Sequence, residues 1–148
     1  MPVQPIPKGY HTITPYLIAK DAGRLVRFLK AAFDAQEIRT THTSDGQVAH
    51  AELKIGNSML MLTEASDTYT EMPVMLYLYV PNVDTLYENA IKAGAESLVA
   101  PQNMYYGDRC AGVRDHSGNQ WWLATHIEDV TDAELARREA EYRKEDEA

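Results

Sequence analysis

The sequence predicts an α+β protein built from two βαβββ units in tandem, followed by a charged C-terminal helix. Three observations lead to this prediction. Apolar residues recur at spacings of three and four in two separate segments, which is typical of amphipathic helices. Each of these segments is followed by β-rich stretches that short turns separate. The pair Gly56-Asn57 in the first half and the pair Gly118-Asn119 in the second occupy matching hairpins, which indicates one repeated unit.

The first half begins with a strand and a helix. Residues 12–19 are rich in β-forming side chains and are bounded by turn residues, so we expect a strand there. Asp21 is a good helix N-cap residue, and the apolar spacing after it predicts an amphipathic helix as far as Asp34. Three further strands are expected at residues 37–42, 47–55 and 58–63.

The second half repeats this order. A buried strand is expected at residues 75–80, and Asn82 caps a helix that Gly94 closes. Further strands are predicted at residues 97–102, 109–114 and 120–126. Thr131 and Glu134 have the spacing of a capping box, which predicts a terminal helix. We therefore expect an extended arm (1–10), a first unit (11–65), a linker (66–74), a second unit (75–130) and the charged helix (131–148).

The composition is typical of a globular protein of the cell interior. A chain of 148 residues with 45% hydrophobic residues is long enough to bury a large core. A formal net charge of -8 disfavours nucleic acid and anionic membranes as partners, and the longest apolar run, residues 74–80, is too short to span a bilayer. Cys110 is the single cysteine, which excludes an intramolecular disulfide. We expect a cytoplasmic protein.

In each unit the helix covers one face of a small sheet, and strand alternation identifies the side chains on the other, open face. Ile13, Leu17 and Ala49 are expected to face the helix. The open faces are expected to present aromatic and methionine side chains, chiefly Tyr16, Met61, Met75, Tyr77 and Trp122. Such a lining suits an apolar or aromatic small molecule. Core packing or a dimer interface is the alternative.

Two groups of polar side chains are candidates for chemistry. Tyr106 and Arg109 flank a glycine turn, where Tyr106 is expected to close over a ligand and Arg109 to bind a ligand anion. The alternative is that Asp108 and Arg109 pair with each other or with a neighbouring loop. The candidates for acid-base or metal chemistry are His50, Glu52 and His126.

Residues 15–21 (PYLIAKD), 50–57 (HAELKIGN) and 106–122 resemble the vicinal oxygen chelate superfamily, in the PhnB-like part of its glyoxalase and bleomycin-resistance group. This resemblance covers roughly residues 10–130 and implies the tandem βαβββ fold. Enzymes of the family hold a divalent metal through four side chains, usually His and Glu. The resemblance places these four positions at Thr14, Met61, Met75 and Trp122. Threonine is a weak donor, thioethers bind soft metals only and indole offers no lone pair, so we expect no metal and no other cofactor.

The resemblance implies a metal-free homodimer that binds an aromatic or drug-like molecule in a groove between its subunits, as drug-sequestering members of the family do. A second hypothesis is a metal-dependent lyase, isomerase or dioxygenase with an unusual site made from His50, Glu52 and His126. A third is an interaction module whose concavity is filled by the partner subunit. The sequence leaves open the ligand and whether a reaction is catalysed.

Overall fold

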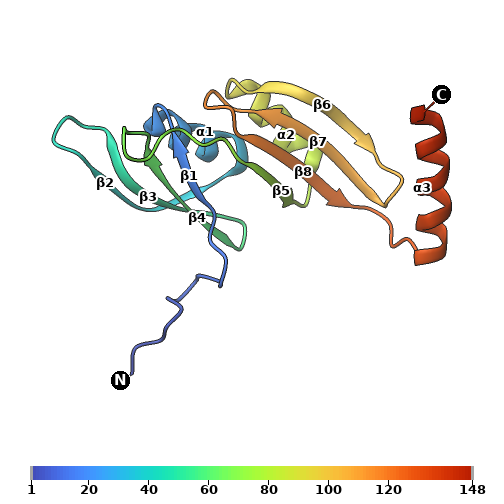
Figure 1. Cartoon of the computed structure of the whole chain (residues 1–148), viewed down its shortest axis with the longest axis horizontal. Helices are drawn as coiled ribbons and strands as arrows, with labels where there is room; N and C mark the ends of the chain where they lie inside the picture. The colour runs from blue at the N-terminus through green and yellow to red at the C-terminus, as the bar shows by residue number, and fades with distance from the viewer. Residues whose placement is uncertain (1, 148) are drawn as a thin grey trace.

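The computed structural model describes residues 2–147 and confirms the predicted fold (Figure 1). The elements are β1 (Tyr16–Ala19), α1 (Ala22–Phe33), β2 (Gln36–His42), β3 (Val48–Ile55), β4 (Ser58–Glu64), β5 (Met75–Tyr79), α2 (Val83–Lys92), β6 (Glu96–Asn103), β7 (Asp108–Arg114), β8 (Gln120–His126) and α3 (Asp132–Glu147). The strands form two four-stranded sheets, ordered β1-β4-β3-β2 and β5-β8-β7-β6. In each sheet the first strand is parallel to its neighbour and the other pairs are antiparallel.

Both predicted helix caps are present. The Asp21 carboxylate accepts a hydrogen bond from the Arg24 amide at 3.3 Å, and the Asn82 side chain accepts one from the Thr85 amide at 3.2 Å. Glu64 at the end of β4 also accepts from the amides of Asp21 and Ala22, each at 2.9 Å. These bonds satisfy free N–H groups at the start of α1 and fix that end of the helix to the sheet.

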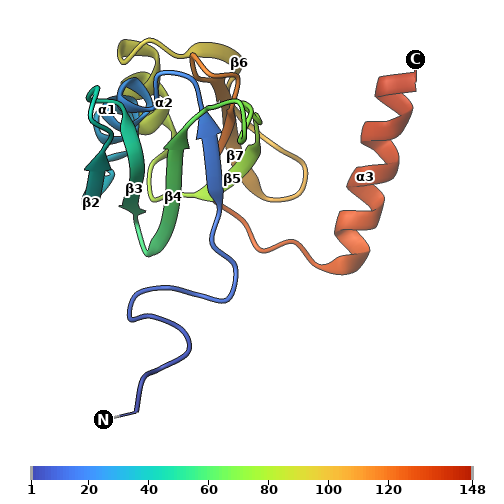
Figure 2. The ribbon, with the colours of Figure 1, turned by 60° about the vertical axis from the view of Figure 1, so that its left-hand side comes forward.

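A single hydrophobic core runs through both units. The sheets lie side by side with β1 and β5 at their adjoining edges, and α1 and α2 pack together on one side of them (Figures 1 and 2). Phe33 of α1 contacts Trp121 of β8, with ring centroids 5.4 Å apart. Trp121 is fully buried and its Nε1 donates to Asp115 at 2.8 Å. The second unit therefore contributes its largest core side chain to a contact with the first.

The turn between β7 and β8 also joins the two units. Asp115 accepts from the amides of Ser117 and Asn119 at 2.9 and 3.1 Å, which fixes the shape of the turn. The Ser117 hydroxyl then accepts from the Lys20 amide at 3.2 Å, and Nε2 of His116 lies 2.8 Å from the Lys20 carbonyl oxygen. This turn of the second unit is thus hydrogen-bonded to the segment between β1 and α1.

The first strand is shorter than the sequence predicts. β1 begins at Tyr16 instead of residue 12, because Pro15 has no N–H to donate to a sheet ladder. The expectation that Ile13 faces the helix is wrong, since this side chain lies before the strand and is 83% exposed. The carbonyl oxygen of Pro15 still accepts from the Met61 amide at 2.9 Å, so the pairing with β4 starts there.

A register shift in β3 corrects the prediction for Ala49. Thr41 pairs with His50 and His42 pairs with Val48, so Ala49 is an extra residue in β3 at this point. A bulge of this kind breaks the alternation of side chains. Val48 is buried in place of Ala49, which is exposed.

The C-terminal helix is present and stands apart from the sheets (Figure 2). Its start matches the predicted cap, because the Thr131 hydroxyl accepts from the Glu134 amide at 3.2 Å. The helix contacts the loop between β6 and β7, where Arg138 donates to the Tyr105 carbonyl at 3.1 Å and the Tyr142 ring lies 5.0 Å from the Tyr105 ring. Among residues 2–147 no helix has the length and apolar character needed to cross a membrane.

Candidate functional site

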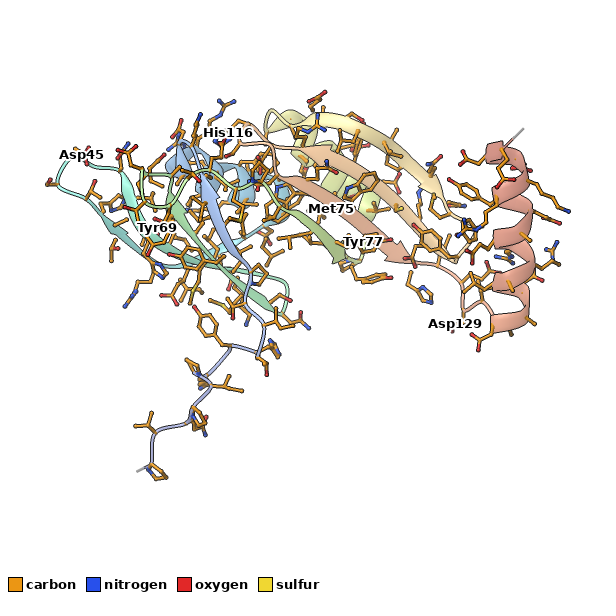
Figure 3. The ribbon with its side chains drawn as sticks, viewed as in Figure 1. Asp45, Tyr69, Met75, Tyr77, His116 and Asp129 are labelled. Atoms are coloured by element: carbon orange, nitrogen blue, oxygen red, sulfur yellow. The ribbon has the colours of Figure 1, made fainter. Side chains whose placement is uncertain are left out.

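Large apolar side chains lie exposed on the faces of the sheets that α1 and α2 leave uncovered. On β5, Met75 and Tyr79 are 61% and 67% exposed, and Tyr77 between Leu76 and Leu78 shares their face. Figure 3 shows Met75 and Tyr77 along this strand. Scattered exposed apolar residues are normal on proteins, but a contiguous set marks a surface that contacts something else.

Strand register places the predicted open-face residues in two rows. In the first sheet Tyr16 lies beside Met61, and Met61 lies beside Glu52. In the second sheet Tyr77 lies beside Trp122, which in turn lies beside Gly112. Residues directly opposite each other on neighbouring strands share a face, so each row is a continuous surface.

The Trp122 indole is held by a glycine. A Cβ atom at Gly112 would lie 2.8 Å from Cζ3 of Trp122, and two further atoms of the same ring would be at 2.9 Å. The six-membered ring of the indole therefore lies directly on the Gly112 backbone. Nε1 of Trp122 donates to Oε1 of Gln120 at 3.1 Å, which also fixes the ring. Trp122 is partly exposed, so part of the indole remains accessible from the open face.

A buried carboxylate organises the polar part of this face. Asp108 is 3% exposed, and its Oδ2 accepts from the hydroxyls of Tyr77 and Tyr79 at 3.0 and 2.9 Å. Its Oδ1 lies 2.9 Å from Nδ1 of His126, whose Nε2 lies 2.8 Å from Oδ1 of Asp129. Both ring nitrogens of His126 thus face carboxylates.

These contacts shift several pKa values. Burial by itself raises the pKa of Asp108, but hydrogen bonds from His126, Tyr79 and Tyr77 outweigh it and the net pKa is lowered. The pKa of His126 is raised by its hydrogen bonds to Asp108 and Asp129. Burial, followed by hydrogen bonding to Tyr106 and Asp108, raises the pKa of Tyr77. The arrangement favours an anionic Asp108, a cationic His126 and protonated phenols.

Tyr106 joins this network from the loop before β7. Its hydroxyl lies 3.4 Å from Sγ of Cys110, and burial together with that contact raises the pKa of Tyr106 to about 12. Tyr77 also forms a hydrogen bond with Tyr106, so this loop lies beside β5.

Arg109 lies on the opposite face. Its Nε and Nη2 each lie 2.9 Å from an oxygen of Asp84, a residue of α2. β7 alternates, and Ala111 and Val113, on the same side as Arg109, are buried under the helix. The expectation that Arg109 joins Tyr106 at the open face is corrected by this placement, and Asp108 pairs with tyrosines and His126 instead of with Arg109.

The first sheet carries a second polar cluster around Glu52. Tyr10, in the arm, donates its hydroxyl to Oε1 of Glu52, and burial with this hydrogen bond raises the pKa of Tyr10 to about 12. Oε2 of Glu52 lies 3.2 Å from Nε of Arg39 and 3.7 Å from Nε2 of His50. His50 and Glu52 are thus brought together, whereas His126 lies on β8 in the other sheet.

The residues present do not fit the divalent metal that the family resemblance implies. At the four corresponding positions stand Thr14, Met61, Met75 and Trp122. This set offers one neutral hydroxyl, two soft thioethers and an indole, which a hard or borderline divalent ion does not favour. Within residues 2–147 no three His, Cys, Asp or Glu side chains are grouped so that they could hold a metal ion.

Two features of this candidate site were not predicted. The first is the role of Asp108 as the acceptor for Tyr77, Tyr79 and His126, and the second is the reach of Tyr10 onto Glu52. A signal for the first exists in the sequence. Strand alternation from Ala111 and Val113 assigns Asp108 to the open face, whereas adjacency in the loop suggested a pair with Arg109.

Comparisons with known proteins agree with this fold. A family model described as the Glyoxalase/Bleomycin resistance protein/Dioxygenase superfamily matches residues 9–123. The chain is 31% identical over 134 residues to the uncharacterized protein Mb0911c of Mycobacterium bovis, which covers 83% of this chain and 88% of that protein.

Solved structures resemble the chain at lower identity. TioX from Micromonospora sp. ML1 matches with a TM-score of 0.69 and 24% identity over 79% of this chain and 99% of that chain. The fosfomycin resistance protein FosX from Mesorhizobium loti has a TM-score of 0.60 and 17% identity over 85% and 97%. A PhnB protein from Bacillus cereus has a TM-score of 0.60 and 16% identity over 78% and 99%. The chain belongs to the glyoxalase, bleomycin resistance protein and dioxygenase superfamily.

Proposed function

We propose that two copies of this chain form a groove that binds an aromatic or drug-like small molecule without a metal ion. The observation that carries the proposal is the pair of rows of exposed and partly exposed aromatic and methionine side chains on the open sheet faces. The residues assigned to the groove are Tyr16, Met61, Met75, Tyr77, Tyr106 and Trp122.

The position of the two open faces supports a homodimer. Within one chain the sheets lie side by side (Figure 1). Met75 and Tyr79 are exposed in the part of the chain that the structure describes. A symmetric dimer that places the first sheet of one copy across the second sheet of the other would enclose both faces. Such an interface would also bury the apolar surface that is exposed in the single chain.

The chemistry of the groove favours a flat and largely uncharged group. Trp122 presents a fixed stacking face, and methionine side chains adapt to irregular shapes. The charge of Asp108 is already engaged by His126 and two phenols, so it does not demand a cation from the ligand. FosX, which shares the fold, is a fosfomycin resistance protein, and this supports a drug-like ligand.

Intrinsic fluorescence tests the proposal. Titration with bleomycin and with planar aromatic antibiotics is expected to change the emission of Trp122 in a saturable way, because a stacked ligand replaces water on the indole. Gly112→Ala pushes the indole off the strand and is expected to weaken binding by about tenfold or more, a loss of about 1.4 kcal/mol. Gly46→Ala, in an open turn of the first unit, is the control.

Three results would contradict the proposal. If the emission stays constant with bleomycin and with all the planar antibiotics at high micromolar concentration, the proposed ligand site does not exist. If light scattering gives the mass of one chain at the protein concentrations used in the binding titration, the groove is not formed by a dimer. Near-stoichiometric divalent metal in protein purified without an affinity tag would contradict the metal-free site.

A further inference from the structure

Two arginines of α1 differ from the other six arginines because they form no ion pair within residues 2–147. Six arginines form ion pairs with carboxylates, namely Arg39, Arg109, Arg114, Arg137, Arg138 and Arg143. Arg24 and Arg27 form no ion pair within residues 2–147. The sequence holds 22 acidic residues against 14 lysines and arginines, so acidic partners are abundant elsewhere. Both of these arginines lie on α1.

Arg24 and Arg27 line the same cavity, which has a volume of about 240 Å³. They are three residues apart and so lie on one face of α1. The opposite side of the cavity is formed by the turn after α2, at Gly94, and by His116 in the turn between β7 and β8. The cavity therefore lies at the junction of the two units, on the side of the molecule that holds the helices.

Several acceptors near this cavity already have hydrogen-bond partners. Asp115 also lines it, but this carboxylate is buried and accepts from two backbone amides, from Nδ2 of Asn119 and from Nε1 of Trp121. At the end of α2 the carbonyl oxygens of Ala90 and Ile91 accept from the amides that follow. His116 is held by the carbonyl oxygens of the segment before α1, to which Nε2 donates because carbonyls only accept. The guanidinium groups of Arg24 and Arg27 have no ion-pair partner among residues 2–147 and remain available to a ligand.

We propose that this cavity binds a small oxyanion, a carboxylate or phosphate group that carries a short apolar substituent. Guanidinium groups bind such oxyanions through paired, charge-assisted hydrogen bonds. Phe28 and Ala31, on the same face of α1, provide an apolar wall for the substituent. The volume equals roughly that of eight water molecules, which suits a metabolite-sized anion better than a drug-sized molecule.

This site is separate from the groove proposed above. Its residues lie on the helix side of the molecule, whereas the groove lies on the open sheet faces. A bound anion would contact α1 of the first unit and the β7–β8 turn of the second. A ligand that binds only the folded state stabilises it by an amount that grows with the logarithm of ligand concentration above the Kd, so the melting temperature rises. Anion binding is therefore expected to be visible as thermal stabilisation.

The test uses inorganic phosphate and butyrate as probes, each compared with chloride at equal ionic strength. In the wild-type chain, a rise in melting temperature with probe concentration and a saturable calorimetric titration are expected for at least one probe. The double variant Arg24→Gln, Arg27→Gln is expected to raise the apparent Kd at least about tenfold, since each lost charge-assisted contact supports that much affinity. A response to phosphate alone identifies a phosphate site, and a response to butyrate alone identifies a carboxylate site.

The matched control is Arg137→Gln, Arg143→Gln, which removes the same charge from α3, outside the cavity. This control is expected to bind the anion as the wild type does, and Trp122→Phe is expected to leave the binding unchanged as well. Equal weakening in both double variants would show a general effect of net charge and would overturn the proposal. The absence of a saturable response to either probe in the wild type would also overturn it. Neither result would affect the groove, which depends on other residues.

Discussion

Asp108 shows how single side chains determine the open face of the second sheet. A carboxylate that is 3% exposed needs partners that replace water, and here two phenols and an imidazole take that role. The hydrogen bonds to Asp108 also fix the hydroxyls of Tyr77 and Tyr79, so both rings keep one orientation. Tyr77 lies beside Trp122. The surface offered to a ligand is therefore ordered before binding, which lowers the entropy lost on association.

The pH dependence of stability should reveal the His126 contact. Because the folded-state pKa of His126 is raised above 6.5, its contribution to stability is fully present below pH 6.5 and is lost as the pH rises through the folded-state pKa. The difference in melting temperature between wild type and His126→Gln is expected to be larger at pH 6 than at pH 9. His11→Gln, at an exposed site before β1, is the control. Equal differences at both pH values would show that the ion pairs do not stabilise the fold.

Gly107 is a second residue whose position strongly disfavours any side chain. Its φ is +97°, and a Cβ atom there would lie 2.3 Å from the Glu128 carbonyl oxygen. Gly46 has a similar φ of +85° but has nothing within 4 Å of such an atom. Gly46→Ala is expected to lower the unfolding free energy by about 1 kcal/mol through backbone strain. Gly107→Ala should cost about 2 kcal/mol more because of overpacking, as urea denaturation would measure. Equal losses would contradict the close approach.

At the scale of elements, α3 acts on the loop that carries Tyr106. Arg138 donates to the Tyr105 carbonyl at 3.1 Å and to Oε1 of Glu128 at 2.7 Å, and Tyr142 packs on the Tyr105 ring. The rings of Tyr105 and Tyr106 meet edge to face, with centroids 5.2 Å apart. A helix that buries none of its own described residues thus holds the edge of the proposed groove.

Hydrogen exchange can measure this role of α3. Arg138→Gln removes the clamp, so amide exchange in residues 104–107 is expected to accelerate by about tenfold, which corresponds to about 1.4 kcal/mol of local opening free energy. Arg143→Gln, which breaks only an exposed pair with Glu139, should leave these amides unchanged. If both variants exchange alike, the loop is held by something other than Arg138.

Most of the elements could be predicted from the sequence because caps, turns and apolar spacing are local signals. Asp21, Asn82 and Thr131 begin helices in the structure as their residue types suggest. The errors occur where a local rule is interrupted. β1 starts only after Pro15, and the bulge at Ala49 reverses the alternation of buried and exposed side chains in β3.

The candidate site could be predicted only in part. Alternation recovers the rows of Tyr16 with Met61 and of Tyr77 with Trp122, since each row lies within one sheet. The contact of Tyr10 with Glu52 joins residues 42 positions apart through a segment with no regular structure, and no sequence pattern reports it. The cavity of Arg24 and His116 likewise depends on how two units pack against each other.

At the scale of the whole molecule, the two units share one core and one polar junction. Asp115 accepts hydrogen bonds that shape the β7–β8 turn, and it also holds the buried indole of Trp121 against Phe33 of the first unit. Loss of this carboxylate would leave the Trp121 N–H buried without an acceptor. The junction thus couples the stability of the second unit to that of the first.

Asp115→Ala is therefore expected to lower the unfolding free energy by about 3 kcal/mol or more, as several buried donors lose their acceptor. The unfolding is expected to remain a single transition by calorimetry, because the core is continuous. Asp67→Ala, at an exposed site, is the control. Two separate transitions in the wild type would show that the units unfold independently.

The outline of the chain affects how its assembly state can be measured. The N-terminal arm extends from one side of the body, and α3 extends from another (Figures 1 and 2). Both projections raise the frictional coefficient while adding little mass. Gel filtration against globular standards would thus report a Stokes radius too large for one chain, and a lone subunit would elute where a larger species is expected.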